Sequence, residues 1–220
     1  MFQALAQLGL EYIELSAFLD TQERPQDLAG YLDPFYSLYI IRYSNHDKMK
    51  AFAKASQRPV INAMSSLEHP CEAVADAYWF DNQVRALDGA RVVIWGQATN
   101  VLRSWTNVAE AAGAIVYSHD SADDTLPEEV DLVVTDGWPR GGAGSPVSLT
   151  MEHLKQMGAP ILLPTPPFTI GEELAFDPTT YAGFAGYSQK ASLLAVQKAI
   201  IRYVLSEAAG QSLDADKPRR

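Results

Sequence analysis

Short apolar, β-branched runs alternate along this chain with longer amphipathic stretches. Such alternation is typical of β-α-β units built around a parallel sheet. We expect helices over residues 2–8, 46–56, 70–86, 100–112, 150–157 and 187–208. We expect strands in the runs "LEYIEL", "SLYIIR", "RPVINA", "ARVVIWG", "AIVYS", "DLVVTDGW" and "PILLPTP". The pattern therefore predicts an α/β protein with parallel sheets.

An internal boundary is expected at "ALDGARV", where an acidic helix ends at Gly89 and a new β-α series begins. We expect a first domain over residues 1–86, a second over 87–186, a C-terminal helix over 187–208 and a flexible tail over 209–220. The tail follows Gly210, a residue type that stops helices, and it is polar throughout.

Charge and cysteine content limit the partners and the cellular compartment that we expect for this protein. The 17 Lys and Arg residues against 27 Asp and Glu give a formal charge of -10, which argues against nucleic acid or an anionic membrane as partner. Cys71 is the single cysteine, so no intrachain disulfide forms and a reducing compartment fits best. The chain shows no signal peptide pattern and no apolar run of the roughly 18 to 20 residues that a membrane span needs. We expect a cytoplasmic protein without a membrane partner.

Polar and special residues follow the expected strands. Ligands of open parallel sheets bind outside the carboxyl ends of the strands, so these residues are the first candidates for a site. The residues are Arg42, Asn62, Gln97, Asn100, Asp136, Trp138 and the run Pro164, Thr165, Pro166 and Pro167. We expect at least one cis bond in that proline run, because X-Pro bonds have only a small trans preference.

A histidine and a proline stand together where a helix is expected to begin, in "MSSLEHPCEAVADAYWF". Pro70 suits a first helical position because it has no N–H to leave unsatisfied. His69 then lies near the electropositive end of the helix, where a neutral imidazole can polarise a carbonyl oxygen. The alternative is a histidine at the helix start with no chemical role. Cys71, inside the first turn of the same helix, is better interpreted as a buried small hydrophobe than as a nucleophile.

Five segments resemble one family, in order and in spacing. "PVINAMSSLEHPCEAVADAYWF" resembles the His-Pro-x-Gln segment of the aspartate and ornithine carbamoyltransferases, and "YLDPFYSLYIIR" resembles the segment in which an arginine ends a strand. "VVIWGQATNVLRSW", "LVVTDGW" and "LPTPPFTIGEEL" resemble the family's Gly-Asp-x-x-Asn-Val-x-x-Ser, Thr-Asp-x-Trp and His-Cys-Leu-Pro segments. The resemblance covers about residues 2 to 205 and leans towards the ornithine-type branch.

The resemblance implies two parallel-sheet, Rossmann-like lobes, with the C-terminal helix returning to the first lobe. The first lobe would bind carbamoyl phosphate and the second an amino acid, without a cofactor or metal, in a homo-oligomer that we expect to be a trimer. Residues matched to carbamoyl phosphate binding and catalysis are Arg42 and His69. Asn100, Ser104, Asp136 and Trp138 match the family's amino-acid pocket. The full set that we expect to bind substrate is Glu72, Asn100, Ser104, Asp136, Trp138, Thr165, Pro166 and Lys190.

Departures from the family pattern are as informative. Glu72 stands where the family has a glutamine, Gln97 where it usually has an aspartate, and "PRGG" where ornithine-type members have Ser-Met-Gly. Pro164 and Thr165 stand where those members have a histidine and a cysteine. "MFQALAQLG" resembles the stretch just after the family's Ser-Thr-Arg-Thr-Arg phosphate segment, so we expect a first lobe truncated at its N-terminus. Cations that could replace that segment are Arg103, Arg140 and Lys190.

Several functions remain open at this stage. The first is carbamoyl transfer to an amino acid; the second is a non-catalytic paralogue that binds an amino acid as a sensor or interaction subunit; the third is a fragment of a complete carbamoyltransferase. A nucleotide-binding protein is a further class, but Gly96 is the single glycine in the loop that should carry a G-x-G-x-x-G fingerprint. His46, His119 and His153 lack the paired spacing of a metal site, so we expect surface or helix-end positions and no metal.

Overall fold

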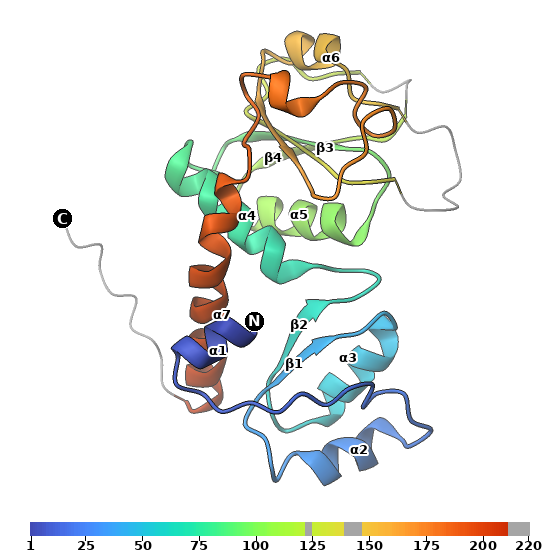
Figure 1. Ribbon diagram of the computed structural model, residues 1–220, viewed down its shortest axis with the longest axis vertical. Coiled ribbons are helices and arrows are strands. Elements are labelled where there is room, and N and C mark those ends of the chain that lie inside the picture. The colour runs from blue at the N-terminus through green and yellow to red at the C-terminus, as the bar shows by residue number, and fades with distance from the viewer. Residues whose placement is uncertain (122–124, 139–146, 211–220) are drawn as a thin grey trace, which may run out of the picture. The chain divides into compact units, whose positions relative to one another are not determined.

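The chain forms two compact units in a computed structural model that describes residues 1–121, 125–138 and 147–210. The first unit contains Met1–Ser66 together with the C-terminal residues from Leu194 onward, and the second contains Leu67–Leu193. Figure 1 shows the helices and strands of both units. Both are α/β units with parallel strands, which confirms the expected fold class.

The first unit has a two-stranded parallel sheet. Strands β1 (Tyr39–Arg42) and β2 (Val60–Met64) pair with Tyr39 opposite Val60. The buried side chains of Tyr39 and Ile41 alternate along β1 and pack in one cluster with Phe52. The helices of this unit are α1 (Phe2–Gln7), α2 (Pro25–Leu32), α3 (His46–Ala55) and α7 (Leu193–Ala208), whose first residue belongs to the other unit.

Helix α7 provides the expected return of the C-terminal helix to the first unit. Its residues from Leu194 onward group with that unit, and Lys198 donates a hydrogen bond of 2.9 Å to the side chain of Gln7. The helix is shorter than expected, because residues Ser188–Ser192 form a 3-10 helix, η2, ahead of it. The tail was expected to be flexible; residues 211–220 lie outside the described ranges.

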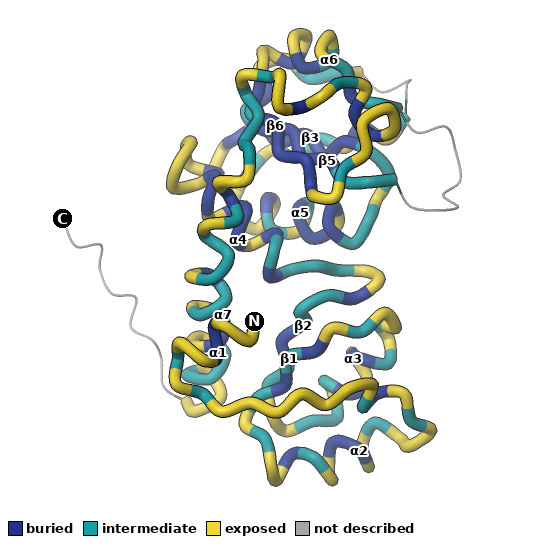
Figure 2. Tube along the Cα trace, in the orientation of Figure 1, coloured by how far each residue is buried: buried dark blue, intermediate teal, exposed yellow. Residues whose placement is uncertain are grey.

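One prediction for the first unit is wrong, and one helix was not predicted. The run "LEYIEL" forms no strand: it has no ladder partner, and its apolar side chains face solvent, with Ile13 70% exposed. Figure 2 shows this segment as a mainly exposed tube. Helix α2 was not expected from the periodicity, although Pro25 at its first position and Asp27 in its first turn are recognised helix-start signals.

The second unit is built around a four-stranded parallel sheet in the order β4-β3-β5-β6. Its strands are β3 (Arg91–Trp95), β4 (Ile115–His119), β5 (Leu132–Thr135) and β6 (Ile161–Pro164). Side chains alternate between the two faces, as the period of a strand requires. Val92 and Ile94 belong to one hydrophobic cluster, whereas Val93 and Trp95 belong to another.

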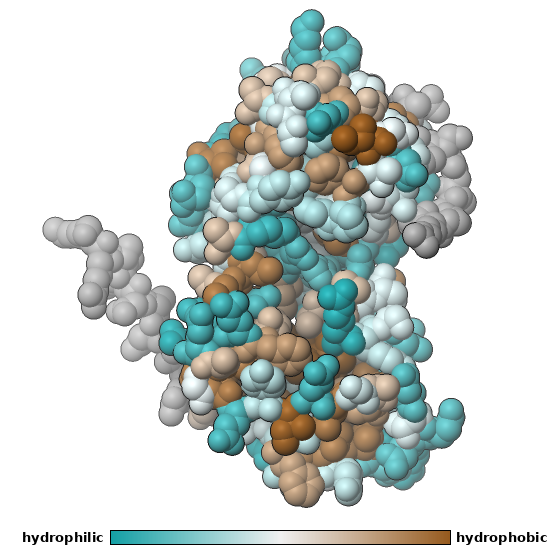
Figure 3. Space-filling view, in the orientation of Figure 1, coloured by the Kyte–Doolittle hydropathy of each residue, from teal (hydrophilic) through white to brown (hydrophobic). Residues whose placement is uncertain are grey.

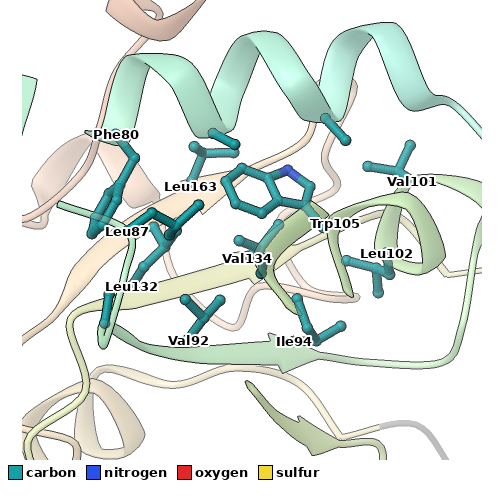
Figure 4. Close-up of a cluster of buried hydrophobic side chains, with 14 of the residues drawn as sticks. Phe80, Leu87, Val92, Ile94, Val101, Leu102, Trp105, Leu132, Val134 and Leu163 are labelled. Atoms are coloured by element: carbon teal, nitrogen blue, oxygen red, sulfur yellow. The ribbon is translucent and has the colours of Figure 1, made fainter. Parts of the chain in front are cut away.

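Helices cover both faces of this sheet. Helices α4 (Pro70–Gln83) and α5 (Asn100–Ala111) contribute to the first cluster, in which Trp105 is fully buried between helix and sheet (Figure 4). Helix α6 (Met151–Gln156) contributes Leu154 to the second cluster. A short 3-10 helix, η1 (Pro178–Thr180), follows β6.

The boundary between the compact units comes before α4, between Ser66 and Leu67, whereas the sequence placed a domain boundary after residue 86. Trp79 and Phe80 explain the position, because these large side chains of α4 are buried in the cluster that α5 and the sheet share. The functional division into a carbamoyl-phosphate domain and an amino-acid domain stays a prediction.

The described surface carries scattered apolar side chains, as Figure 3 shows for one face. In the first unit the more exposed of them are Ile13, Tyr31 and Phe35. None of the helices within the described ranges combines the length and the apolar character needed to cross a membrane.

Candidate functional site

The strand order of the second unit brings three of the expected site segments to one edge. Trp95 at the end of β3 lies opposite Thr135 at the end of β5, which in turn lies opposite Pro164 at the end of β6. The chain leaves these strands toward Asn100, Asp136 and Thr165, respectively. Since the strands are parallel, these three residues follow carboxyl ends at the same edge of the sheet, where α/β proteins bind ligands.

Ser104 connects His69 to helix α5. The backbone N–H of His69 donates a hydrogen bond of 2.8 Å to Ser104 Oγ, and the Ser104 hydroxyl donates one of 2.9 Å to the carbonyl of Asn100. Ser104 is buried. The hydroxyl expected to lie near the substrate therefore fixes the start of α4 against the start of α5, and so positions His69.

A cluster of ionisable side chains begins at His69, the residue that precedes the first turn of α4. Nδ1 of its ring lies 2.8 Å from Glu72 Oε2, and the other oxygen of Glu72 forms an ion pair with Lys190. Nζ of Lys190 also lies 3.5 Å from both carboxylate oxygens of Asp76. Glu72 and Asp76 are four residues apart and so share one face of α4, while Lys190 comes from η2.

The two carboxyl groups of this cluster have opposite electrostatic environments. Contacts with His69 and Lys190 lower the pKa of Glu72 to about 2, against the effect of burial. Burial raises the pKa of Asp76 to about 6, although Lys190 opposes that shift. Asp76 is only 2% exposed, so its ionised form depends on Lys190 for compensation.

Asp136 lies within electrostatic reach of the same cluster. Burial raises the pKa of its carboxyl, while hydrogen bonds from the Thr99 side chain and the Gly137 backbone lower it. Glu72 and His69 also act on this carboxyl through their charges. The structure therefore brings His69, Glu72 and Asp136 together in one unit, and a partly buried carboxylate of this kind suits a substrate ammonium group.

Two buried polar atoms of residues that follow the ends of β5 and β6 lack partners within the described ranges. These are Thr165 Oγ1 and Trp138 Nε1. Buried polar groups are normally hydrogen-bonded, so such atoms are candidates for contact with a ligand. The neighbouring peptide bond from Pro166 to Pro167 is cis, as expected for this run.

The other expected residues belong to different parts of the chain. Arg42 ends β1 in the first unit, where it is exposed. Arg140 and the "PRGG" segment reach into residues 139–146, which lie outside the described ranges. Cys71 is buried, and burial raises the pKa of its thiol to about 11, which fits a small hydrophobe rather than a nucleophile.

The histidines were expected at surface or helix-end positions. His46 and His153 do stand in the first turns of α3 and α6, and His153 closes a capping box with Thr150. The expectation is wrong for His119, which is buried at the end of β4 with its ring stacked on Trp95 at 4.0 Å between centroids. The described residues contain no cluster of three or more His, Cys, Asp or Glu that could hold a metal ion.

Two functional candidates escaped the sequence analysis. Asp76 lies one helical turn after Glu72, and this i,i+4 spacing of two acids is a signal that the sequence did contain. Thr99 caps α5 by accepting a hydrogen bond from the backbone of Leu102, and its side chain also bonds to Asp136. Only the fold shows the second contact, because Asp136 belongs to a distant strand.

Comparisons with known proteins agree with this geometry. Residues 2–82 match the sequence model described as "Aspartate/ornithine carbamoyltransferase, carbamoyl-P binding domain". Ornithine carbamoyltransferase of Nitrobacter winogradskyi is 34% identical over 109 residues, covering 48% of this chain and 35% of that protein. The corresponding enzyme of Halorhodospira halophila is 33% identical over 138 residues, covering 60% of this chain and 45% of that protein. The chain thus matches less than half the length of these relatives.

A solved structure extends the similarity across both units. The crystal structure of ornithine carbamoyltransferase from Thermus thermophilus matches with a TM-score of 0.78 and 23% identity, covering 92% of this chain and 79% of that one. At this identity the match shows the fold. Residues 2–82 therefore match a domain of the aspartate/ornithine carbamoyltransferase family, and the chain has the fold of an ornithine carbamoyltransferase across both units.

Proposed function

We propose that this protein transfers a carbamoyl group from carbamoyl phosphate to the amine of an amino acid, with ornithine the first acceptor to test. One observation carries the proposal: the partly buried carboxyl of Asp136 follows the end of β5 at the carboxyl edge of the sheet, and the charge of His69 acts on it. An ammonium-binding acid and a carbonyl-polarising imidazole are the two groups that this reaction needs close together. The family match and the names of the relatives support the same activity.

The reaction needs no covalent intermediate on the protein. The neutral amine of the acceptor attacks the carbonyl carbon of carbamoyl phosphate and forms a C–N bond. The C–O bond to phosphate then breaks, inorganic phosphate leaves with the bonding electrons, and the amine nitrogen loses one proton. The rate gain comes from holding the two substrates together and from stabilising negative charge on the carbonyl oxygen.

His69 is assigned to that carbonyl oxygen. Nδ1 lies 2.8 Å from Glu72 Oε2, so Nε2 is the ring nitrogen assigned to the substrate. Ser104 fixes the backbone of His69, so the ring starts from a held position. In the first unit, Arg42 is assigned to phosphate binding, because a guanidinium suits phosphate oxygens.

The acceptor is assigned to the strand ends of the second unit. Asp136 and Asn100 would bind the α-amino and α-carboxylate ends of the amino acid, with the carboxylate of Asp136 on the α-ammonium group. Thr165 and Trp138 would offer the buried hydroxyl and indole N–H that have no other partner among the described residues. Pro166 and Lys190 complete the assigned set, with Lys190 placed through its ion pair to Glu72.

A non-catalytic paralogue that binds only the amino acid is the alternative, which the names of the relatives do not favour; Glu72 is the residue that raises it. A carboxylate beside a phosphate-bearing ligand is repulsive unless it is paired. Here Glu72 is paired with Lys190, so the cluster carries a cation as well. This pairing keeps a transferase compatible with the presence of Glu72.

Turnover separates the two candidates. The purified chain is incubated with carbamoyl phosphate together with ornithine in one reaction and with aspartate in another. The carbamoylated amino acid is detected by mass spectrometry. We expect product with ornithine that increases linearly with protein concentration. Amino-acid binding by calorimetry without any product would support the paralogue and refute the transferase.

The proposal extends to assembly and location. We propose a homotrimer, on the strength of the family resemblance, and a cytoplasmic location, which a single buried cysteine suits. Size-exclusion chromatography with light scattering tests the trimer: a mass three times the 24.1 kDa of the chain is expected, and a monomer at all concentrations would refute it.

A further inference from the structure

Lys190 shares its positive charge with two carboxylates of the second unit. Its Nζ forms an ion pair with Glu72 Oε1 and lies 3.5 Å from both oxygens of Asp76. The side chains of Lys190 and Glu72 are 27% and 21% exposed, so both remain open to solvent on one side. The side chain of Asp76 is closed off from solvent, since this residue is only 2% exposed.

The charges of Lys190, Glu72 and Asp76 together determine how strongly this group attracts an anion. An ammonium group has three N–H donors and no acceptor, and here carboxylate oxygens from two residues lie close to it. A phosphate approaching Lys190 meets the negative charge of Glu72 at nearly the same distance. The attraction of Lys190 is therefore largely cancelled where a ligand can reach it.

We propose that Glu72 is a specificity-determining residue that withholds Lys190 from anionic ligands and keeps the affinity of the site for a phosphate-bearing substrate low. The identity of that substrate as carbamoyl phosphate rests on the proposed function; the binding effect itself does not. Asp76 has a different part. It lies behind Lys190, away from solvent, and positions the ammonium without competing directly for an incoming anion.

The first experiment compares inorganic phosphate binding by wild type and Glu72→Gln, using calorimetry at constant ionic strength. The glutamine keeps the size of the side chain and removes its charge, so Lys190 becomes available. We expect the affinity for phosphate to rise about tenfold, which corresponds to one strong charge interaction. Under the proposed function, the KM for carbamoyl phosphate should fall by a similar factor.

Three variants show whether Lys190 is the cause. In the double variant Glu72→Gln/Lys190→Met, the increase in phosphate affinity should disappear. Asp76→Asn should change phosphate affinity less than about threefold, because Glu72 still holds the ammonium. Glu152→Gln removes the same charge from the first turn of α6 and is the matched control, with no gain expected. Circular dichroism checks that each variant is folded.

Lys190→Met leaves Asp76 buried beside no cation, so the double variant can be unstable. The triple variant Glu72→Gln/Asp76→Asn/Lys190→Met removes every charge of the three and keeps the test available. The inference is overturned if the folded Glu72→Gln variant binds phosphate no more tightly than wild type. It is also overturned if the higher phosphate affinity persists without Lys190, or if Glu152→Gln raises the affinity as much. Absence of turnover by wild type would refute the transferase and leave this binding result intact.

Discussion

Asp136 allows the most direct test of a single residue assignment. Its pKa is raised by burial, and Thr99 and Gly137 bond to it, so the carboxylate is held in one place. Asp136→Asn keeps the shape and removes the charge. A charge-assisted hydrogen bond to an ammonium contributes about 1.5 to 3 kcal/mol, so ornithine should bind about ten- to a hundredfold more weakly.

The Asp136 prediction has its own control. His69→Ala should leave ornithine binding within about twofold of wild type, because His69 is assigned to the other substrate. Calorimetry of both variants gives the answer. Equal ornithine affinity for wild type and Asp136→Asn would remove Asp136 from the acceptor site.

Asp76 makes the stability of the fold depend on pH in a defined window. Its pKa is about 6 in the fold and 3.8 ordinarily, so the folded state binds more protons between these values, and stability falls as pH rises through them. The shift corresponds to about 3 kcal/mol above pH 6. Glu72 acts in the opposite sense: its pKa is about 2 against 4.5, so its contribution is present above pH 4.5 and is lost as pH falls toward 2.

Urea unfolding of wild type and Asp76→Asn between pH 4 and 7 isolates this contribution. The difference in unfolding free energy between the two should change in favour of the variant as pH rises from about 4 to 6, and should level off above that range. The groups around the carboxyl that set this slope are Lys190, Glu72 and His69. Parallel pH profiles for both proteins would show that Asp76 ionises normally in the fold.

At the scale of elements, the start of α4 depends on its bond to α5. The Ser104 hydroxyl accepts a hydrogen bond from the backbone N–H of His69 and donates one to the backbone carbonyl of Asn100. Ser104→Ala leaves that buried N–H without its acceptor, which should cost about 1 to 3 kcal/mol of stability. It should also lower kcat, since His69 loses its anchor.

A second hydroxyl on α5 gives the matched control. Thr106 donates to the carbonyl of Leu102 within the helix, at 3.0 Å, and makes no bond to α4. Thr106→Ala should therefore have little effect on kcat. Chemical unfolding and steady-state kinetics of both variants test the pair; equal kcat values for Ser104→Ala and wild type would mean that His69 needs no such anchor.

The sequence predicted the elements that follow a simple period and missed those that depend on partners. The strands β3, β5 and β6 consist mainly of apolar residues, so the sequence alone predicted their positions. The run "LEYIEL" also contains residues that favour strands, but it has no ladder partner in the described structure, and pairing cannot be derived from one run alone. The contacts of Asp76 and Thr99 likewise depend on distant segments, which no local pattern records.

At the scale of the whole molecule, the family resemblance and the structure support each other. Five segments in order predicted the two α/β units, and the strand order then brought Asn100, Asp136 and Thr165 to one edge. Glu72 was the departure whose effect the sequence left open. The structure pairs it with Lys190, a contact across 118 residues that no spacing rule gives.

Carbamoyl transfer is the central claim, and its most direct test is product formation by wild type and His69→Ala with carbamoyl phosphate and ornithine. Wild type should form the carbamoylated amino acid. The variant should bind ornithine unchanged and lose about a hundredfold or more in kcat, as enzymes do when one donor to a developing oxyanion is removed. Undiminished turnover by His69→Ala, or no product from wild type with either acceptor, would contradict the account.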